Sequence, residues 1–439
     1  MEFPEPESFD SIVGDVTLPP LARVQYDPPT PSLSNPTERT RKAVESLPLS
    51  TLQDGATVAI GIGSRGIHDI VEIATSVVDS VRDAGFDPVV VPAMGSHGGA
   101  TPEGQRETLA ALGISEETLD CPIDARMDTA VLGRGDLDFD VHFSEAALEA
   151  DACLVVNRVK AHTNFTGDIE SGLCKMLTIG LGKQKGADTA HANALVEGYE
   201  AVIRDAVDII RREAPVVGGI AIVENFADEV GLIEGVSANR LLEREPELLT
   251  QAHEWMPTLP YDELDVLVVD RFGKDISGSG MDTNVIGRYQ ILNEPEPETP
   301  QIKRIYLRNL SERSHGNGNG LGLADITRRS VIDDVDLQQV YANTLTSNSL
   351  SKAKIPLVAP DDELALTAAV STIGPYDPET ARIAWIEDTS SLTSFRVSPA
   401  LLDDNDASDH ISVVGWDTVT FEDGSATFLE TTPPTEDAL

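Results

Sequence analysis

Short apolar runs rich in β-branched residues recur along the chain, and a segment with helical periodicity follows most of them. Each run has the length and composition of a buried strand. They lie at 57–64, 87–94, 152–159, 216–225 and 264–270. The segment after the first run is amphipathic up to Gly85, and Thr101 and Pro102 suit the N-cap and first residue of a later helix. Strands that alternate with helices predict an α/β fold whose mainly parallel sheets are covered on both faces.

The length and the proline pattern predict two α/β domains. A chain of 439 residues is too long for one ordinary core, and prolines interrupt the alternation near 255–264. We therefore expect domains at 1–260 and 261–439, with the active site in the cleft between them. The Pro-rich residues 1–50 predict an edge strand and an extended lead-in. Near the C-terminus, 410–430 predicts a β-hairpin that packs back on the N-terminal domain, before a disordered acidic end.

The charge of the chain limits its partners. With 74 acidic and 32 basic residues its formal net charge is -42. Such a field repels nucleic acid and anionic membranes, so a small-molecule substrate is expected. The carboxylates are dispersed and lysine is scarce, which is typical of proteins adapted to concentrated salt. No pattern of the sequence indicates an oligomeric state.

The beginning of the chain and its cysteines indicate in which cellular compartment the protein is expected. The acidic start MEFPEPESFD lacks the charged and apolar regions of a signal peptide, and no apolar run has the length of a membrane span. The three cysteines are widely spaced without a CxxC pair, so neither a disulfide framework nor a zinc ribbon is expected. We therefore expect a cytoplasmic protein.

Four predicted loops follow strands and are rich in glycine and serine. Ligands of open parallel sheets bind at the carboxyl ends of the strands, so these loops are candidates for one cleft. Three of them carry Arg65, His97 and His162, and the fourth is RFGKDISGSGMDTN. An arginine suits a carboxylate substrate, and two histidines after neighbouring strands suit acid/base chemistry. The remaining histidines, at 68, 142, 253, 315 and 410, are expected to be surface or structural residues.

The segment from His162 to His191 concentrates rare cationic groups. It holds two of the eight histidines and three of the nine lysines. Lys175 lies in the apolar stretch GLCKMLTIG, where desolvation would lower its pKa and leave a nucleophilic amine. Lys183 and Lys185 lie among glycines, as phosphate-binding cations do, but without the motif of a nucleoside triphosphatase.

Several of these motifs together resemble the nickel-pincer-dependent lactate racemase family of 2-hydroxyacid isomerases. The motifs are MGSHGGATPEG, KAHTNFTGDIESGLCK, the interval from Lys175 to His191, and GKDISGSGMDTNVIGR. The likeness covers roughly residues 55–290 and is weaker toward the C-terminus. One departure lies at Ile62, where members such as lactate racemase have an aspartate.

The resemblance implies a role for each matching residue. It makes Lys175 the covalent attachment point of the cofactor, His191 the nickel ligand, and His97 and His162 the catalytic acid/base pair. Gly98, Gly99 and Lys183 are expected to line the cofactor. Substrate binding is assigned to Arg65, with Lys274 or Arg288 replacing the family's C-terminal lysine.

The resemblance also implies a cofactor and a reaction. The cofactor is nickel held by a pyridinium-3-thioamide-5-thiocarboxylate mononucleotide, whose soft sulfur donors suit nickel. It accepts the C2 hydrogen of a 2-hydroxy acid as hydride and returns it to either face, which makes the protein a racemase or epimerase.

Other readings of these residues remain open at the level of sequence. Lys175 could form the Schiff base of a pyridoxal-phosphate enzyme, although no partner for the pyridine nitrogen is evident. A non-catalytic binder of an anionic ligand would not need two acid/base histidines. A zinc hydrolase lacks its usual ligand motif.

Overall fold

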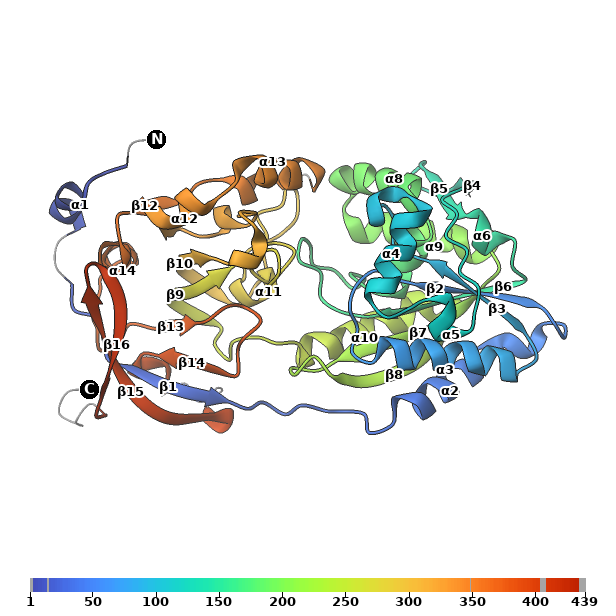
Figure 1. Ribbon diagram of the computed structural model, residues 1–439, viewed down its shortest axis with the longest axis horizontal. Coiled ribbons are helices and arrows are strands. Elements are labelled where there is room, and N and C mark those ends of the chain that lie inside the picture. Colours follow the sequence, from blue (N-terminus) through green and yellow to red (C-terminus); the bar gives the residue numbers. More distant parts are fainter. Residues whose placement is uncertain (1–2, 14–15, 348, 403–407, 434–439) are drawn as a thin grey trace. The chain divides into compact units, whose positions relative to one another are not determined.

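The computed structural model describes residues 3–13, 16–347, 349–402 and 408–433 (Figure 1). The chain forms two compact units, Thr30–Met256 and Met1–Pro29 with Pro257–Leu439. The fold class is α/β, with parallel strands in both units. The first 29 residues thus join the C-terminal unit, whereas the sequence placed them in the N-terminal domain. Their strand β1 (Leu21–Tyr26) forms its backbone hydrogen bonds with strands from the end of the chain, which explains the difference.

The unit Thr30–Met256 contains a five-stranded sheet of order β3-β2-β6-β7-β8. The first four strands are parallel and β8 is antiparallel to β7. The bounds of the four parallel strands agree with the predicted strands, because the buried apolar runs identify them, whereas β8 was not predicted. These bounds are β2 (Thr57–Ile62), β3 (Asp87–Pro92), β6 (Ala152–Arg158), β7 (Val216–Glu224) and β8 (Val230–Ser237).

Helices cover both faces of this sheet. Alternate residues of β2 enter different hydrophobic clusters, with Ile60 in one and Ala59 in the other. The first cluster is completed by α2 (Pro36–Glu45), α3 (Ile70–Asp83) and α4 (Pro102–Ala111). The second is completed by α8 (Lys183–Glu197), α9 (Tyr199–Glu213) and α10 (Leu241–Trp255). As predicted, Thr101 caps α4 by accepting a hydrogen bond from the N–H of Gly104.

The other unit contains a nine-stranded mixed sheet. Its order is β12-β11-β10-β9-β13-β14-β1-β15-β16; the first five strands are parallel and the rest antiparallel. The parallel part of this sheet agrees with the predicted α/β class, and the antiparallel part makes the sheet as a whole mixed. The bounds are β9 (Glu263–Phe272), β10 (Gln301–Leu310), β11 (Ile326–Arg328), β12 (Leu357–Ala359), β13 (Ile383–Ile386), β14 (Ser394–Val397), β15 (Ile411–Glu422) and β16 (Ser425–Thr431).

Strand β1 lies inside this sheet, between β14 and β15, and is not the edge strand that the sequence predicted. The predicted C-terminal hairpin exists as β15 and β16, and it pairs with β1 of its own unit. The predicted acidic end, 434–439, lies outside the described residues.

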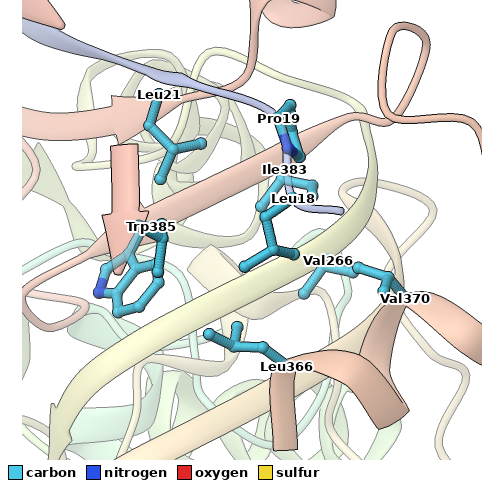
Figure 2. Close-up of a pocket in the computed structure, with 9 residues that line it drawn as sticks. Leu18, Pro19, Leu21, Val266, Leu366, Val370, Ile383 and Trp385 are labelled. Carbon is cyan, nitrogen blue, oxygen red and sulfur yellow. The ribbon is translucent and has the colours of Figure 1, made fainter. Parts of the chain in front are cut away.

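The N-terminal segment also contributes to the core of this unit. Leu18, Pro19 and Leu21 lie against Val266 and Trp385 around a cavity of about 10 Å³ (Figure 2). Its lining is apolar, so it offers a water molecule no polar partner and is a packing gap.

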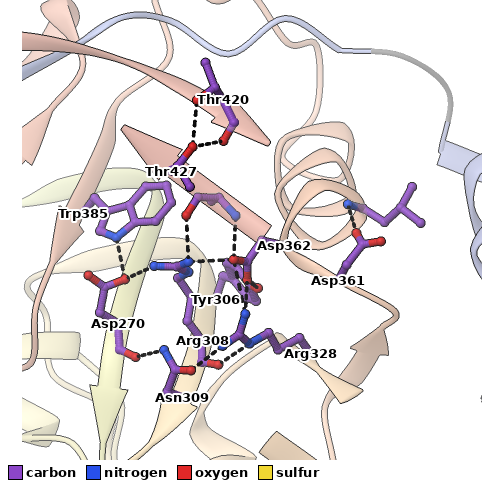
Figure 3. A network of polar contacts seen from close by, with 12 residues as sticks. Asp270, Tyr306, Arg308, Asn309, Arg328, Asp361, Asp362, Trp385, Thr420 and Thr427 are labelled. Atoms are coloured by element: carbon purple, nitrogen blue, oxygen red, sulfur yellow. Dashed lines mark hydrogen bonds and ion pairs between the residues drawn. The ribbon is translucent and has the colours of Figure 1, made fainter. Parts of the chain in front are cut away.

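A polar network ties β9, β10, β11, β13 and β16 to α14 (Asp362–Ser371) (Figure 3). The buried carboxylate of Asp362 accepts hydrogen bonds from Arg308 at 2.6 Å and from the hydroxyl of Tyr306 at 2.5 Å. Arg308 also contacts Asp270, which accepts from the indole of Trp385 at 2.8 Å. Burial favours a raised pKa for Asp362, but the hydrogen bonds from Arg308 and Tyr306 outweigh it and lower the pKa. The carboxylate of Asp362 therefore stays charged and holds α14 against the sheet through these hydrogen bonds.

None of the helices in the described parts of the chain combines the length and apolarity needed to cross a membrane.

Candidate active site

Three adjacent parallel strands deliver the predicted site loops to one edge of the sheet. Ile62, the last residue of β2, pairs with Pro92 of β3 and with Val156 of β6. The loops carrying Arg65, His97 and His162 therefore begin side by side, because parallel strands end at the same edge. The fourth predicted loop, 271–284, begins at the end of β9 and belongs to the other unit.

The loop that carries His97 follows an unusual backbone path. Gly98, Gly99 and Ala100 all have positive φ angles, of 67°, 65° and 55°. A side chain at Gly98 would meet the carbonyl carbon of Gly104 at 2.4 Å, whereas Gly99 has open space around it. Glycine at 98 is thus needed for packing as well as conformation. Gly98 and Gly99 shape the loop, and their contact with a cofactor stays a prediction.

His97 contacts Ser64, which comes from the loop after β2. The Oγ of Ser64 lies 2.5 Å from Nδ1 of His97. Partial burial lowers the pKa of His97, and the positive charges of Arg65 and Lys175 lower it further. The imidazole is therefore neutral at pH 7 and is able to accept a proton. Arg65 itself is exposed, as a residue that binds a carboxylate substrate must be.

His162 is held through both its backbone and its ring. Its backbone N–H donates to Oε2 of the buried Glu170 at 2.5 Å, and Oε1 of Glu170 accepts from the N–H of Gly167 at 3.2 Å. Nδ1 of His162 accepts a hydrogen bond from the N–H of Asn164 at 3.1 Å. The ring lies against Phe165, with 4.4 Å between the centroids. The loop after β6 is thus pinned by a carboxylate that the sequence analysis did not single out.

Lys175 ends a short helix, α7 (Leu173–Lys175), and the next five residues, Met176–Gly180, form a π-helical turn. Such turns occur frequently at functional sites. The carbonyl of Gly180 accepts from the N–H of Gly95 at 3.0 Å, which ties this turn to the His97 loop. Burial and the charges of Lys160 and Arg65 lower the pKa of Lys175 to about 7. A large fraction of this amine is therefore uncharged, and thus nucleophilic, at neutral pH.

His191 lies on α8, next to Tyr199 at the start of α9. Its Nδ1 is 3.1 Å from the hydroxyl of Tyr199. The ring of Tyr199 stacks on Phe165 at 4.7 Å with an interplanar angle of 9°, and Phe165 also contacts His162. Burial and the charge of Lys175 lower the pKa of His191 to about 4, so its imidazole is neutral. With Nδ1 engaged by Tyr199, Nε2 is the nitrogen suited to a metal.

Lys183 does not fit the expected phosphate-binding role. Its side chain is 0% exposed, and its ammonium donates to the carbonyl of Pro92 at 2.7 Å and to Oε1 of Gln105 at 3.3 Å. These contacts make Lys183 an internal brace between β3 and α4. The glycine-rich surroundings that suggested a phosphate site instead allow the backbone to pack closely here, since Gly182 and Gly186 lie against Thr178 and His142.

Two residues of the other unit, Lys274 and Arg288, were predicted to bind the substrate, and their hydrogen-bond partners differ. Arg288 is engaged internally, by Asp325 at 2.8 Å and by the carbonyls of Leu323 and Ile302 at 3.0 and 2.7 Å. It is thus a structural residue, contrary to the prediction. Lys274 donates to the carbonyl of Gly278 within its own loop at 2.7 Å.

Lys352, which the sequence analysis did not single out, is the buried cation beside that loop. It donates to the hydroxyl of Ser279 at 2.7 Å, and burial together with the charge of Lys274 lowers its pKa to about 8.

The sequence matches no protein-family model and no curated protein. A crystal structure of a Thermotoga maritima protein, solved in a structural genomics programme, is similar to this chain with 15% sequence identity and a TM-score of 0.44. The alignment covers 82% of this chain and 90% of that chain. At this level the similarity carries no argument about substrate or chemistry.

Proposed function

We propose that the protein is a racemase or epimerase of a 2-hydroxy acid that works with a nickel-pincer nucleotide attached to Lys175. The observation that carries the proposal is that one edge of the sheet brings together a lysine and neutral histidines in a strongly acidic protein. Lys175, with its lowered pKa, and the neutral His97 and His191 are close enough for the charge of Lys175 to affect both imidazoles.

The residues present suit the attachment of such a group. The amine of Lys175 is a nucleophile for a covalent link, and Nε2 of His191 is a single nitrogen donor. Among the described residues, no three or more His, Cys, Asp and Glu gather into a metal site of their own. A nickel ion here would therefore take most of its ligands from the nucleotide's sulfur and carbon atoms. When bound, that group would accept the C2 hydrogen as hydride and return it.

The remaining residues would bind the substrate and handle its hydroxyl proton. The exposed guanidinium of Arg65 would pair with the carboxylate. His97 and His162, from loops that begin at the same sheet edge, would contact the hydroxyl group and stabilise its deprotonated form. The buried Phe165 and the partly buried Tyr199 would keep water away from one side of the site.

Intact mass and nickel content of protein produced together with the cofactor-synthesis enzymes test this proposal. Wild type should carry the nucleotide adduct, contain nickel and interconvert the enantiomers of a 2-hydroxy acid. Lys175→Ala should show only the mass of the polypeptide, because it lacks the attachment amine. Lys185→Ala, which removes an exposed lysine nearby, is the matched control and should keep the adduct.

Retention of the adduct by Lys175→Ala would refute the assignment. An adduct with the mass and absorption of pyridoxal phosphate, without nickel, would establish the competing lysine-enzyme reading.

A further inference from the structure

The two active-site histidines have different hydrogen-bond partners at Nδ1. In His162 this nitrogen accepts from the backbone N–H of Asn164 at 3.1 Å. A backbone amide nitrogen can only donate, so the neutral ring of His162 must carry its proton on Nε2. In His97 the same nitrogen lies 2.5 Å from the hydroxyl of Ser64, which can either donate or accept. His97 can therefore carry its proton on Nδ1 and offer a lone pair at Nε2.

This difference decides which ring can act as a base. A histidine that takes a proton at Nε2 must already carry its other proton on Nδ1. His97 meets that condition through Ser64. His162 does not, because a proton on its Nδ1 would point at the N–H of Asn164. Glu170 holds the loop in this arrangement by accepting from the N–H groups of His162 and Gly167.

We propose that the two histidines divide the work: His97, paired with Ser64, transfers the hydroxyl proton, and His162 only donates a hydrogen bond from Nε2 to the substrate oxygen. The inference rests on the proposed function. The proton leaves the substrate hydroxyl for Nε2 of His97, whose Nδ1–H is accepted by Ser64, and it later returns to the same oxygen. His162 gains and loses no proton. One base suffices for both enantiomers when the 2-oxo acid turns its other face toward the returning hydride while its oxygen stays within reach of Nε2 of His97, because the face that hydride enters sets the configuration at C2.

Glutamine substitutions in the cofactor-loaded enzyme separate the two roles. A glutamine amide can donate a hydrogen bond but cannot transfer a proton. His97→Gln should lower kcat on the order of 10²- to 10⁴-fold, as expected for loss of an acid/base group. His162→Gln should lower it only about tenfold, the effect of one weakened hydrogen bond.

Equal losses in the two glutamine variants would overturn the division of roles and leave the racemase proposal intact. A larger loss in His162→Gln than in His97→Gln would overturn it as well. If the wild-type enzyme carries no adduct and isomerises no 2-hydroxy acid, the proposed function is rejected instead. The NMR measurement described next does not depend on the proposed function.

The ¹⁵N NMR signals of histidine-labelled protein without the cofactor test the hydrogen bonding directly. His162 should show a protonated Nε2 and an unprotonated Nδ1. Ser64→Ala should change the nitrogen signals of His97, Ser64→Thr should restore them, and Ser96→Ala, in the same loop as His97, should leave them as in wild type. A protonated Nδ1 in neutral His162, or a His97 that does not respond to Ser64→Ala, would contradict the proposal.

Discussion

At the scale of single residues, Glu245 supports the segment that carries Lys175. This carboxyl group is buried, and its Oε2 accepts from the N–H of Cys174 at 2.9 Å, at the start of the helix that ends in Lys175. The backbone of Gly172 passes so close that a side chain there would meet Oε1 of Glu245 at 2.4 Å. Burial raises the pKa of Glu245 to about 7, despite the N–H groups that favour its charged form.

The raised pKa of Glu245 predicts a pH-dependent stability. An unfolded glutamate has a pKa of about 4.3, so the stabilising contribution of Glu245 is fully present below that pH and is lost as the pH rises through the folded value. Glu245→Gln keeps the acceptor for Cys174 and never ionises. Its melting temperature should therefore rise relative to that of wild type between about pH 5 and pH 8.

Glu243→Gln, at an exposed position of the same helix, is the control for this measurement by thermal unfolding. If the melting temperatures of wild type and Glu245→Gln differ by a constant amount across the pH range, the buried carboxyl group does not ionise there.

At the scale of elements, the loop between β3 and α4 positions His97 by its backbone path. Its positive φ angles at 98–100 give one left-handed turn, which L-residues with side chains adopt only at a cost. Gln105 of α4 holds the turn by donating to the carbonyl of Gly95 at 2.9 Å. The helix and the loop therefore form one unit, and a change at their contact should displace the imidazole.

Paired alanine substitutions measure this contact. Gly98→Ala places a methyl group against the backbone of Gly104, whereas Gly99→Ala introduces the same positive-φ strain in open space. Gly99→Ala should lower the free energy of unfolding by about 1 kcal/mol. Gly98→Ala should lower it by about 2–4 kcal/mol, because overpacking adds to the strain. Equal effects in denaturant unfolding would show that the loop and α4 are not tightly coupled.

At the scale of the whole molecule, the net charge of -42 dominates the electrostatics. Surface ion pairs exist, such as Arg126 with Asp124 at 2.7 Å and Glu149 at 2.6 Å, but the 74 acidic residues far outnumber the 32 basic ones. Repulsion among them weakens the folded state at low ionic strength, and salt screens it.

The melting temperature should therefore rise steeply from dilute buffer to molar KCl. Sucrose, which favours compact states without screening charge, should give a smaller effect at equal osmolarity. Because the chain has two units, each unfolding transition should be followed separately. Melting temperatures that do not respond to KCl would remove the argument for adaptation to salt.

The sequence by itself determined the alternation of strands and helices, the loops that follow β2, β3 and β6, and the functional candidates in those loops. These features depend on local periodicity and on the rule that parallel strands end at a common edge. The apolar surroundings of Lys175 could likewise be predicted without a structure, because the apolar residues that desolvate its amine are neighbours of Lys175 in the chain.

Only the tertiary structure decided which partner each of these residues meets. Ser64 and His97 are 33 residues apart, and Cys174 and Glu245 are 71 residues apart, so no spacing rule connects them. The same holds for β1, which is inserted between strands formed more than 350 residues later in the chain. Lys183 and Arg288 have the charge of ligand-binding residues, yet buried carbonyl groups and Asp325 engage them. A charged side chain takes its role from the groups that long-range packing brings within a few ångströms, and local sequence does not contain that information.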